Sequence, residues 1–202
     1  MDQQVIDAMK RWPGVPDVYG WLRLDRRARW CLIDRNQPGF DPQRDATGSP
    51  IGNRQLIDFI ARNYQVDERG CWYWQNGPQR AFVELELAPW ILRVLTSPSD
   101  PERQALVTHT GLACDRTAHW CIGVDGQLYV TTDHGIGVVH DLDLASLRLT
   151  LDDAAEGGGL QGRLDWNGRL VDVESRAAPV GGFVKSPLTT FGETPRGIRP
   201  QA

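Results

Sequence analysis

Two histidines and two cysteines lie close together in the second half of the chain, with the spacing His109-x4-Cys114-x4-His119-x-Cys121. Imidazole and thiolate groups are common ligands of a tetrahedral zinc ion. With a strand period of two, His119 and Cys121 would project from the same face. Structural zinc sites, however, usually combine tightly spaced Cys or His pairs, and cysteine also packs as a small hydrophobe. We therefore predict no metal and no other cofactor, and keep a metal-binding protein or metalloenzyme that uses residues 109–121 as the alternative.

Other catalytic chemistry has little support in the sequence. It contains no G-x-S-x-G nucleophile elbow, no C-x-x-C pair and no Walker loop, and the glycine run at 157–159 follows no expected buried strand. His134 and His140 flank a glycine-rich stretch. We expect both to be exposed turn histidines, because a catalytic role would need a partner residue that the sequence does not show. Four carboxylates lie on expected strands, where alternation places them on the face exposed to solvent. They are Glu84, Glu86, Asp141 and Asp143. These observations favour a non-enzymatic protein and yield no catalytic candidate.

A polar turn beside two tryptophans is the best candidate for a recognition surface. Trp72 and Trp74 share one face of an expected strand, where their rings would either stack on a ligand or pack in the core. Asn76-Gly77-Pro78 then ends the strand. The candidate surface consists of Trp72, Trp74, Gln75, Asn76, Gln79 and Arg80. The sequence leaves open whether this turn binds a partner or is purely structural.

The elements that must position these residues are strands, tight turns and a helix. Asp67-Glu68-Arg69-Gly70 is a turn signature, and residues 71–75 and 80–87 alternate as the strands that follow it. Residues 53–64 carry an apolar stripe at helical spacing, and Asn53 can cap this helix. A second short helix is expected over residues 2–12. The arrangement predicts helices that feed into antiparallel strands.

A weaker copy of the central stretch follows in the second half. Asp125-Gly126 forms the turn, residues 127–132 the strand, and residues 136–144 the second run. Turn chemistry and strand period agree in both copies. We predict an α+β fold, mainly antiparallel β, with two related helix/β-meander repeats. The expected divisions are an N-terminal α+β repeat at 1–95, a linker at 96–102, a C-terminal β-rich repeat packed on it at 103–176, and a loosely ordered tail at 177–202.

Composition and charge restrict the class of protein. A chain of 202 residues with 41% hydrophobic and 24% charged residues is long enough to bury a good core. The net charge of −4 argues against a nucleic-acid partner. The N-terminus does not resemble a secretory signal, and no apolar run is long enough for a membrane helix. We therefore expect a cytoplasmic protein, without a membrane partner, whose four cysteines are reduced.

A set of residues in the central stretch resembles a family pattern. The matching positions are Pro50-Ile51, Leu56-Ile57, Asp67-x-x-Gly70-x-Trp72-Tyr73, Gly77-Pro78-x-x-Arg80 and Val83-Glu84-x-Glu86-x-Ala88-Pro89. They resemble an uncharacterised bacterial family of similar length, classed as a domain of unknown function, and the resemblance extends over about residues 18–147. It implies a β-rich α+β fold of repeated motifs, with no established activity and with an interaction or signalling role as the expected function of such a family.

The sequence as a whole favours a cytoplasmic binding or protein-interaction module. Its partner, a protein or a small molecule, is not identified by any motif. A third reading is a homo-oligomer in which the face bearing Trp72 and Trp74 forms the interface between copies.

Overall fold

The computed structural model describes residues 1–123, 126–152 and 161–176. The chain is mostly β, with a few short helices and two mixed sheets. It divides into two compact units. Within the described residues, unit 1 comprises residues 1–25 and 29–86, and unit 2 comprises residues 26–28 and 87–176. The tail predicted at 177–202 lies outside the described residues.

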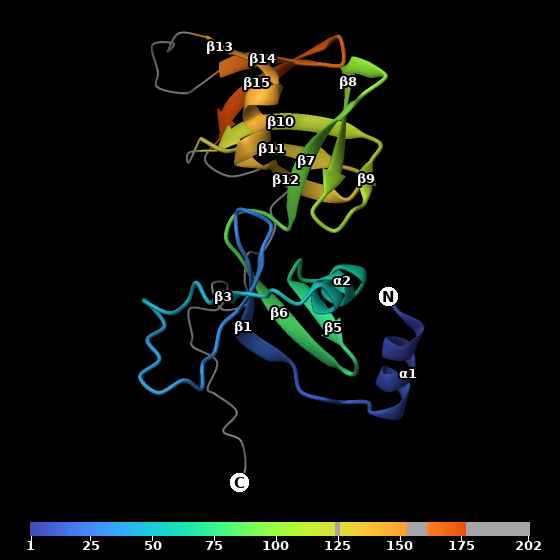
Figure 1. The fold of residues 1–202 in the computed structure, drawn as a ribbon, viewed down its shortest axis with the longest axis vertical. Coiled ribbons are helices and arrows are strands. Elements are labelled where there is room, and N and C mark those ends of the chain that lie inside the picture. The colour runs from blue at the N-terminus through green and yellow to red at the C-terminus, as the bar shows by residue number, and fades with distance from the viewer. Residues whose placement is uncertain (124–125, 153–160, 177–202) are drawn as a thin grey trace. The chain divides into compact units, whose positions relative to one another are not determined.

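Unit 1 contains a six-stranded sheet with the order β3-β2-β1-β6-β5-β4 (Figure 1). Its elements are α1 (Gln3–Arg11), β1 (Val18–Leu24), β2 (Trp30–Leu32), β3 (Ser49–Pro50), α2 (Arg54–Arg62), β4 (Tyr64–Val66), β5 (Trp72–Asn76) and β6 (Gln79–Leu85). Neighbouring strands pair antiparallel except β1 and β6, which run parallel. The sheet is therefore mixed. The chain passes through β2–β5 before β6 pairs with β1.

The helix predicted at residues 53–64 is confirmed as α2. The Asn53 side chain caps it by accepting a hydrogen bond from the Leu56 backbone N–H at 3.1 Å. Its apolar stripe is only partly covered, since Ile60 is fully buried whereas Leu56 is half-buried. Asn63, just after the helix, accepts a hydrogen bond from the Asp2 backbone N–H at 2.8 Å and so ties the start of α1 to the end of α2.

The turn predicted at residues 67–70 forms as its chemistry requires. The Asp67 carboxylate accepts hydrogen bonds from the backbone N–H groups of Arg69 at 3.0 Å and Cys71 at 2.8 Å. Gly70 adopts a φ of 80°, a conformation that costs glycine little. The turn is followed by β5, which pairs with β4 on one side and β6 on the other.

Unit 2 contains a nine-stranded sheet with the order β13-β14-β15-β10-β11-β12-β7-β8-β9. Its elements are β7 (Trp90–Ser97), β8 (Asp100–Thr108), β9 (Ala113–Cys114), β10 (Thr117–Gly123), β11 (Leu128–Thr132), β12 (Gly135–Val139), the 3₁₀ helix η1 (Asp141–Ser146), β13 (Arg148–Leu151), β14 (Gln161–Trp166) and β15 (Arg169–Arg176). β7 pairs parallel with β12, and β10 pairs parallel with β15. Ile91, Leu92, Leu106 and Leu164 are among the most deeply buried residues of its core.

Two local predictions are wrong. Residues 96–102, expected as a linker, form the end of β7, a tight turn and the start of β8. The expectation failed because polar residues interspersed with Pro98 and Pro101 resemble a loop in the sequence. Residues 136–144, expected as one strand, divide into β12 and η1. The break occurs because the His140 side chain caps η1 by accepting a hydrogen bond from the Leu142 backbone N–H at 3.2 Å.

The two units share one arrangement of six strands. Read from the β4 edge, the order in unit 1 is β4-β5-β6-β1-β2-β3. In unit 2 the order β10-β11-β12-β7-β8-β9 corresponds to it strand for strand. In each unit the sixth strand runs parallel to the first. The units differ in what joins the third strand to the fourth. Helix α2 makes this connection in unit 1, whereas only residues 115 and 116 separate β9 from β10.

Candidate functional site

The candidate recognition surface is divided between two faces of the β5–β6 hairpin. The register pairs Trp74 with Ala81, Gln75 with Arg80, and Asn76 with Gln79. Because side chains alternate along a strand, Trp74, Asn76 and Gln79 lie on the face that α2 partly covers. Gln75 and Arg80 lie on the opposite face. The six predicted residues therefore do not form one continuous surface.

Two of the six predicted residues belong to the core. Trp72 is buried against Tyr64, with ring centroids 4.8 Å apart. Gln75 is 2% exposed and donates a hydrogen bond from Nε2 to the Gly77 carbonyl at 2.9 Å. Trp74 is only half-buried and meets the edge of Phe59 from α2 at 5.9 Å. Of the two tryptophans, Trp74 alone is placed to contact a partner.

Trp74 borders an apolar groove of about 570 Å³ on the α2 face of the unit 1 sheet. Strands β1 and β2 supply Leu22 and Leu32, which pair directly across the ladder. The segment between β3 and α2 supplies Ile51, and the first turn of α2 supplies Leu56. The groove is thus built from five neighbouring strands, β3, β2, β1, β6 and β5, and the start of one helix.

The size of α2 explains why the groove stays open. Six strands at a spacing of about 4.8 Å form a sheet about 24 Å across, whereas a helix with its side chains is about 10–12 Å wide. One helix of nine residues can therefore cover only part of the face. It covers the Trp72–Tyr64 side and leaves Leu32, which is 52% exposed, at the other side of the groove.

The groove differs from the rest of the surface in its lack of charge. None of the fourteen described residues that line it is charged. Its polar groups are neutral, and several already have structural partners. Gln79 donates from Nε2 to the Pro16 carbonyl at 3.0 Å, and Asn53 caps α2. The exposed amide of Asn76 lies at the end of β5. A site of this composition suits an uncharged, mainly apolar group.

The opposite face of the hairpin is occupied by a structural network. Arg80 makes a two-pronged ion pair with Asp17, at 2.9 and 2.7 Å, which raises the pKa of the guanidinium. Its guanidinium also lies over the ring of Phe82 at 5.6 Å. Phe82 stacks on Tyr19 with ring centroids 4.8 Å apart. These contacts hold β6 to the chain before β1, so Arg80 has a structural role.

Among the described residues, the four Cys and His residues of the alternative metal hypothesis do not form one group. Cys121 is buried, whereas His119 on the same strand is exposed. Burial lowers the pKa of His109 to about 3 and keeps its ring neutral. Among the described residues, Cys114 is grouped instead with Asp133 and His134. The stretch at 109–121 thus includes Cys114 but not Asp133 and His134, which lie in the β11–β12 turn.

The other acidic candidates form structural pairs. Asp143 lies in η1, not on a strand, and accepts hydrogen bonds from Arg93 Nε at 2.6 Å and from the Val94 backbone N–H at 3.0 Å. Burial opposes its ionisation, but these hydrogen bonds outweigh that effect and lower its pKa. Glu86 pairs with Arg23 at 3.0 Å. These carboxylates therefore join elements within each unit.

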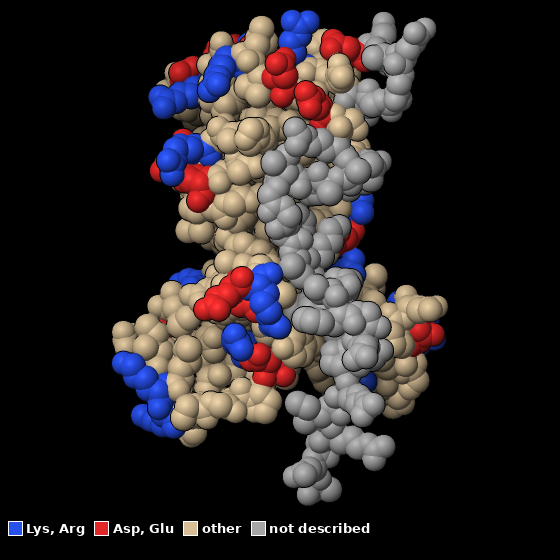
Figure 2. All heavy atoms as spheres, turned by 180° about the vertical axis from the view of Figure 1, so that it is seen from behind, with Lys and Arg blue, Asp and Glu red and all other residues tan. Residues whose placement is uncertain are grey.

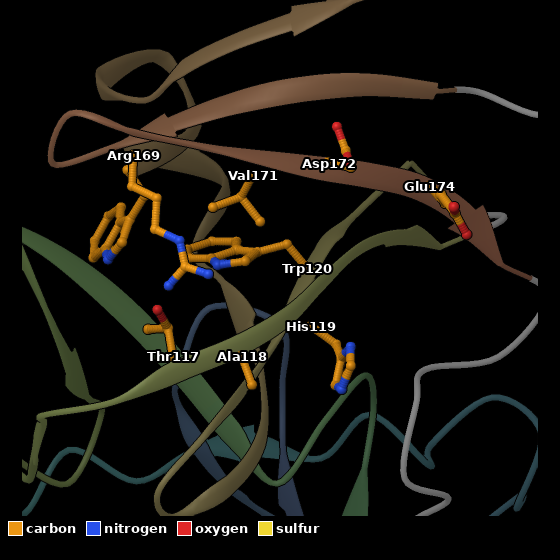
Figure 3. Close-up of a pocket in the computed structure, with 9 residues that line it drawn as sticks. Thr117, Ala118, His119, Trp120, Arg169, Val171, Asp172 and Glu174 are labelled. Atoms are coloured by element: carbon orange, nitrogen blue, oxygen red, sulfur yellow. The ribbon is translucent and has the colours of Figure 1, made fainter.

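A second hollow, of about 450 Å³, lies in unit 2 along β10, β14 and β15 (Figure 3). The rings of Trp120 and Trp166 meet there at 5.2 Å, and Figure 3 shows Arg169 extending toward Trp120. Unlike the groove of unit 1, it is bordered by charges of both signs, including Arg169, Asp172 and Glu174. It contains His119 but no residue of the predicted recognition surface.

The described surface shows no dominant sign of charge on the face drawn in Figure 2, where acidic and basic side chains are interspersed. No helix among the described residues has the length and apolar character needed to cross a bilayer. Together with the fold, these features define a β-rich protein with a candidate apolar binding groove.

The comparison with protein families agrees with the resemblance seen in the sequence. The chain belongs to the DUF2944 family, described as "Protein of unknown function (DUF2946)", whose model matches residues 1–187. The prediction of an uncharacterised family is therefore confirmed. No curated protein matches the chain.

Two solved structures of DUF1285 family proteins are similar to the chain. The protein from Shewanella baltica OS155 has a TM-score of 0.41 at 11% identity, over 62% of this chain and 87% of the other. The protein from Silicibacter pomeroyi DSS-3 has a TM-score of 0.44 at 14% identity, over 86% of this chain and 94% of the other.

Proposed function

We propose that the protein is a non-enzymatic binding module whose unit 1 groove holds an uncharged, mainly apolar small molecule. The observation that carries the proposal is the groove itself, about 570 Å³ in size and without a charged residue among those described in its lining. Small-molecule sites usually measure about 300–1,000 Å³ and combine an apolar lining with a few polar groups. This groove matches both criteria.

The lining gives a ligand two kinds of contact. Trp21 and Trp74 offer aromatic surface, and Leu32 and Leu56 offer aliphatic surface that is accessible in the free protein. Covering such surface is favourable by about 25 cal/mol per Å². The exposed Asn76 amide can bond one polar group at the end of the ligand. A charged ligand would lose its hydration without gaining an opposite charge.

The alternatives are a protein partner, in signalling or otherwise, and a second copy of the chain on this face. Both would also cover apolar surface, but they would need an interface much larger than the groove. Sedimentation distinguishes the second copy. A monomer–dimer equilibrium that is abolished by a charge in the groove would favour self-association over a small ligand.

The proposal is tested with straight-chain alcohols and the fatty acids of matching chain length. Octanol, decanol and dodecanol are expected to displace the uncharged dye Nile red saturably, with affinity that rises about fourfold per added CH₂ group. The acids, ionised at neutral pH, are expected to compete less well. Tryptophan fluorescence should change on binding, because Trp21 and Trp74 line the groove.

The Leu32→Lys variant places a charge in the groove at an exposed position and is expected to weaken alcohol binding by at least about tenfold. Val66→Lys is the matched control, because Val66 is 46% exposed in the edge strand β4 and does not line the groove. Non-saturable binding in the wild type, or equal binding by both variants, would overturn the proposal.

A further inference from the structure

The edge strand β9 and the β11–β12 turn bring three potential metal ligands together in unit 2. Cys114 comes from β9, and Asp133 and His134 form the turn. One ligand atom from each, the thiol sulfur, a carboxylate oxygen and a ring nitrogen, lies within 4.8 Å of the other two. Strands β10 and β11 separate Cys114 from the turn in the sequence, and the fold of unit 2 makes the three residues neighbours.

The β11–β12 turn is held by several hydrogen bonds. Trp90 donates from Nε1 to the His134 carbonyl at 2.7 Å. The Thr132 hydroxyl donates to the Gly135 carbonyl at 2.9 Å and accepts from the His134 backbone N–H at 3.1 Å. Because backbone and side chains both fix the turn, the ligand groups stand on a preorganised support.

Contacts across the site hold the turn to β9. The ring of His134 places Nε2 2.8 Å from the Ala113 carbonyl and 4.0 Å from Asp133 Oδ2. The Asp133 carboxylate also accepts hydrogen bonds from the backbone N–H groups of Asp115 and Arg116, just after β9. The imidazole and the carboxylate are therefore both directed toward the strand that carries Cys114.

We propose that Cys114, Asp133 and His134 form a binding site for a zinc-like divalent transition-metal ion. The mixture of sulfur, nitrogen and oxygen favours such an ion over magnesium or calcium, which prefer oxygen ligands alone. Three protein ligands leave a fourth tetrahedral position for water or for a group from another molecule. The ion would fasten the edge strand β9 to the β11–β12 turn.

The site needs only a small contraction to hold the ion. Bonds of about 2.0–2.3 Å place tetrahedral ligand atoms about 3.3–3.8 Å apart, so atoms now within 4.8 Å must approach by at most about 1.5 Å. Rotation of side chains on the fixed turn can supply this movement, since the His134 side chain is 28% exposed.

Cobalt(II) is the probe for the test, because it occupies zinc sites and reports thiolate ligation by a sulfur-to-metal charge-transfer band. The purified full-length protein, freed of metal by a chelator, is titrated with cobalt(II) and then with zinc(II). We expect one cobalt(II) per chain, a charge-transfer band, and displacement of the cobalt by zinc.

The variants assign the ligands. Cys114→Ser should remove the charge-transfer band, and His134→Asn should weaken cobalt(II) binding by more than about tenfold. His119→Asn is the matched control, because His119 is an exposed histidine of the same unit and lies outside the cluster. It should bind cobalt(II) like the wild type. Circular dichroism of each variant confirms that the fold is retained.

The wild-type titration by itself can overturn the proposal, whatever the variants do. Absence of a stoichiometric site or of the thiolate band would do so, as would an equal loss of binding in His119→Asn. The proposal does not depend on the groove of unit 1, because alcohol binding and cobalt(II) binding are measured separately and rest on different residues.

Discussion

Burial lowers the pKa of His109 to about 3 and makes this residue a source of acid sensitivity. Its Nδ1 accepts a hydrogen bond from the Ile91 backbone N–H at 3.3 Å, a role that requires the neutral ring. The unfolded chain takes up a proton near pH 6.5, whereas the folded protein does not until about pH 3. The stability that depends on the neutral ring is therefore present above pH 6.5 and is lost as the pH falls.

The His109→Gln variant tests this sensitivity. The wild type is expected to lose up to about 2 kcal/mol of unfolding free energy from this residue between pH 7 and pH 5. The variant should lose less, because its amide does not titrate. Urea unfolding at the two pH values measures the difference, with His119→Gln as the exposed control. An acid loss as large in His109→Gln as in the wild type would contradict the account.

Sequence reasoning at the residue scale succeeded where chemistry is local. The cap at Asn53 and the turn at Asp67 form as expected, because each depends on a few adjacent residues. It did not find Trp21 or Leu32 as groove residues, because a strand pattern cannot show which apolar side chains the helix leaves uncovered. The apolar stripe predicted over residues 53–64 does include Leu56, which the structure places in the groove lining.

At the scale of elements, α2 determines both the core and the groove of unit 1. Ile60 packs fully into the core, and Phe59 meets Trp74, while Leu56 in the first turn contributes to the groove lining. The start of the helix thus forms one wall of the proposed binding site. Its position depends on the Asn53 cap. The cap accepts a hydrogen bond from a backbone N–H that has no acceptor within the helix.

The Asn53→Ala variant is expected to cost about 1 kcal/mol of unfolding free energy through loss of the cap. Because Leu56 lies in the turn that the cap fixes, alcohol binding should also weaken, although Leu56 itself is unchanged. Asn53→Ser, which restores a capping oxygen, should recover both properties. Thermal unfolding and the Nile red displacement assay measure them. If Asn53→Ser recovered stability but not alcohol binding, Asn53 would instead contact the ligand directly.

At the scale of the molecule, the strand orders of the two units are the same over six strands. The two units therefore resemble each other in the order of these strands. The sequence suggested the alignment of β5–β6 with β11–β12, because both hairpins keep their turn residues. It could not show the parallel pairs β1–β6 and β7–β12, since hydrophobic alternation does not reveal which distant strands pair.

The parallel junction between β7 and β12 provides a test at this scale. Gly137 pairs with Trp90, and an added Cβ would lie 2.6 Å from the Leu92 side chain. Gly137→Ala should therefore cost about 1–3 kcal/mol by overpacking. The companion substitution Leu92→Val should relieve part of the cost. Urea unfolding of the single and double variants measures the coupling, and strictly additive effects would contradict a clash at this junction.

The shared strand order places the two proposed sites in equivalent positions. In unit 1 the third strand, β3, and the residues that flank the β5–β6 turn both line the groove. In unit 2 the third strand, β9, and the β11–β12 turn carry the Cys114, Asp133 and His134 cluster. The same place in the strand order thus carries uncharged side chains in unit 1 and potential metal ligands in unit 2, so one arrangement of strands can present two different kinds of chemistry.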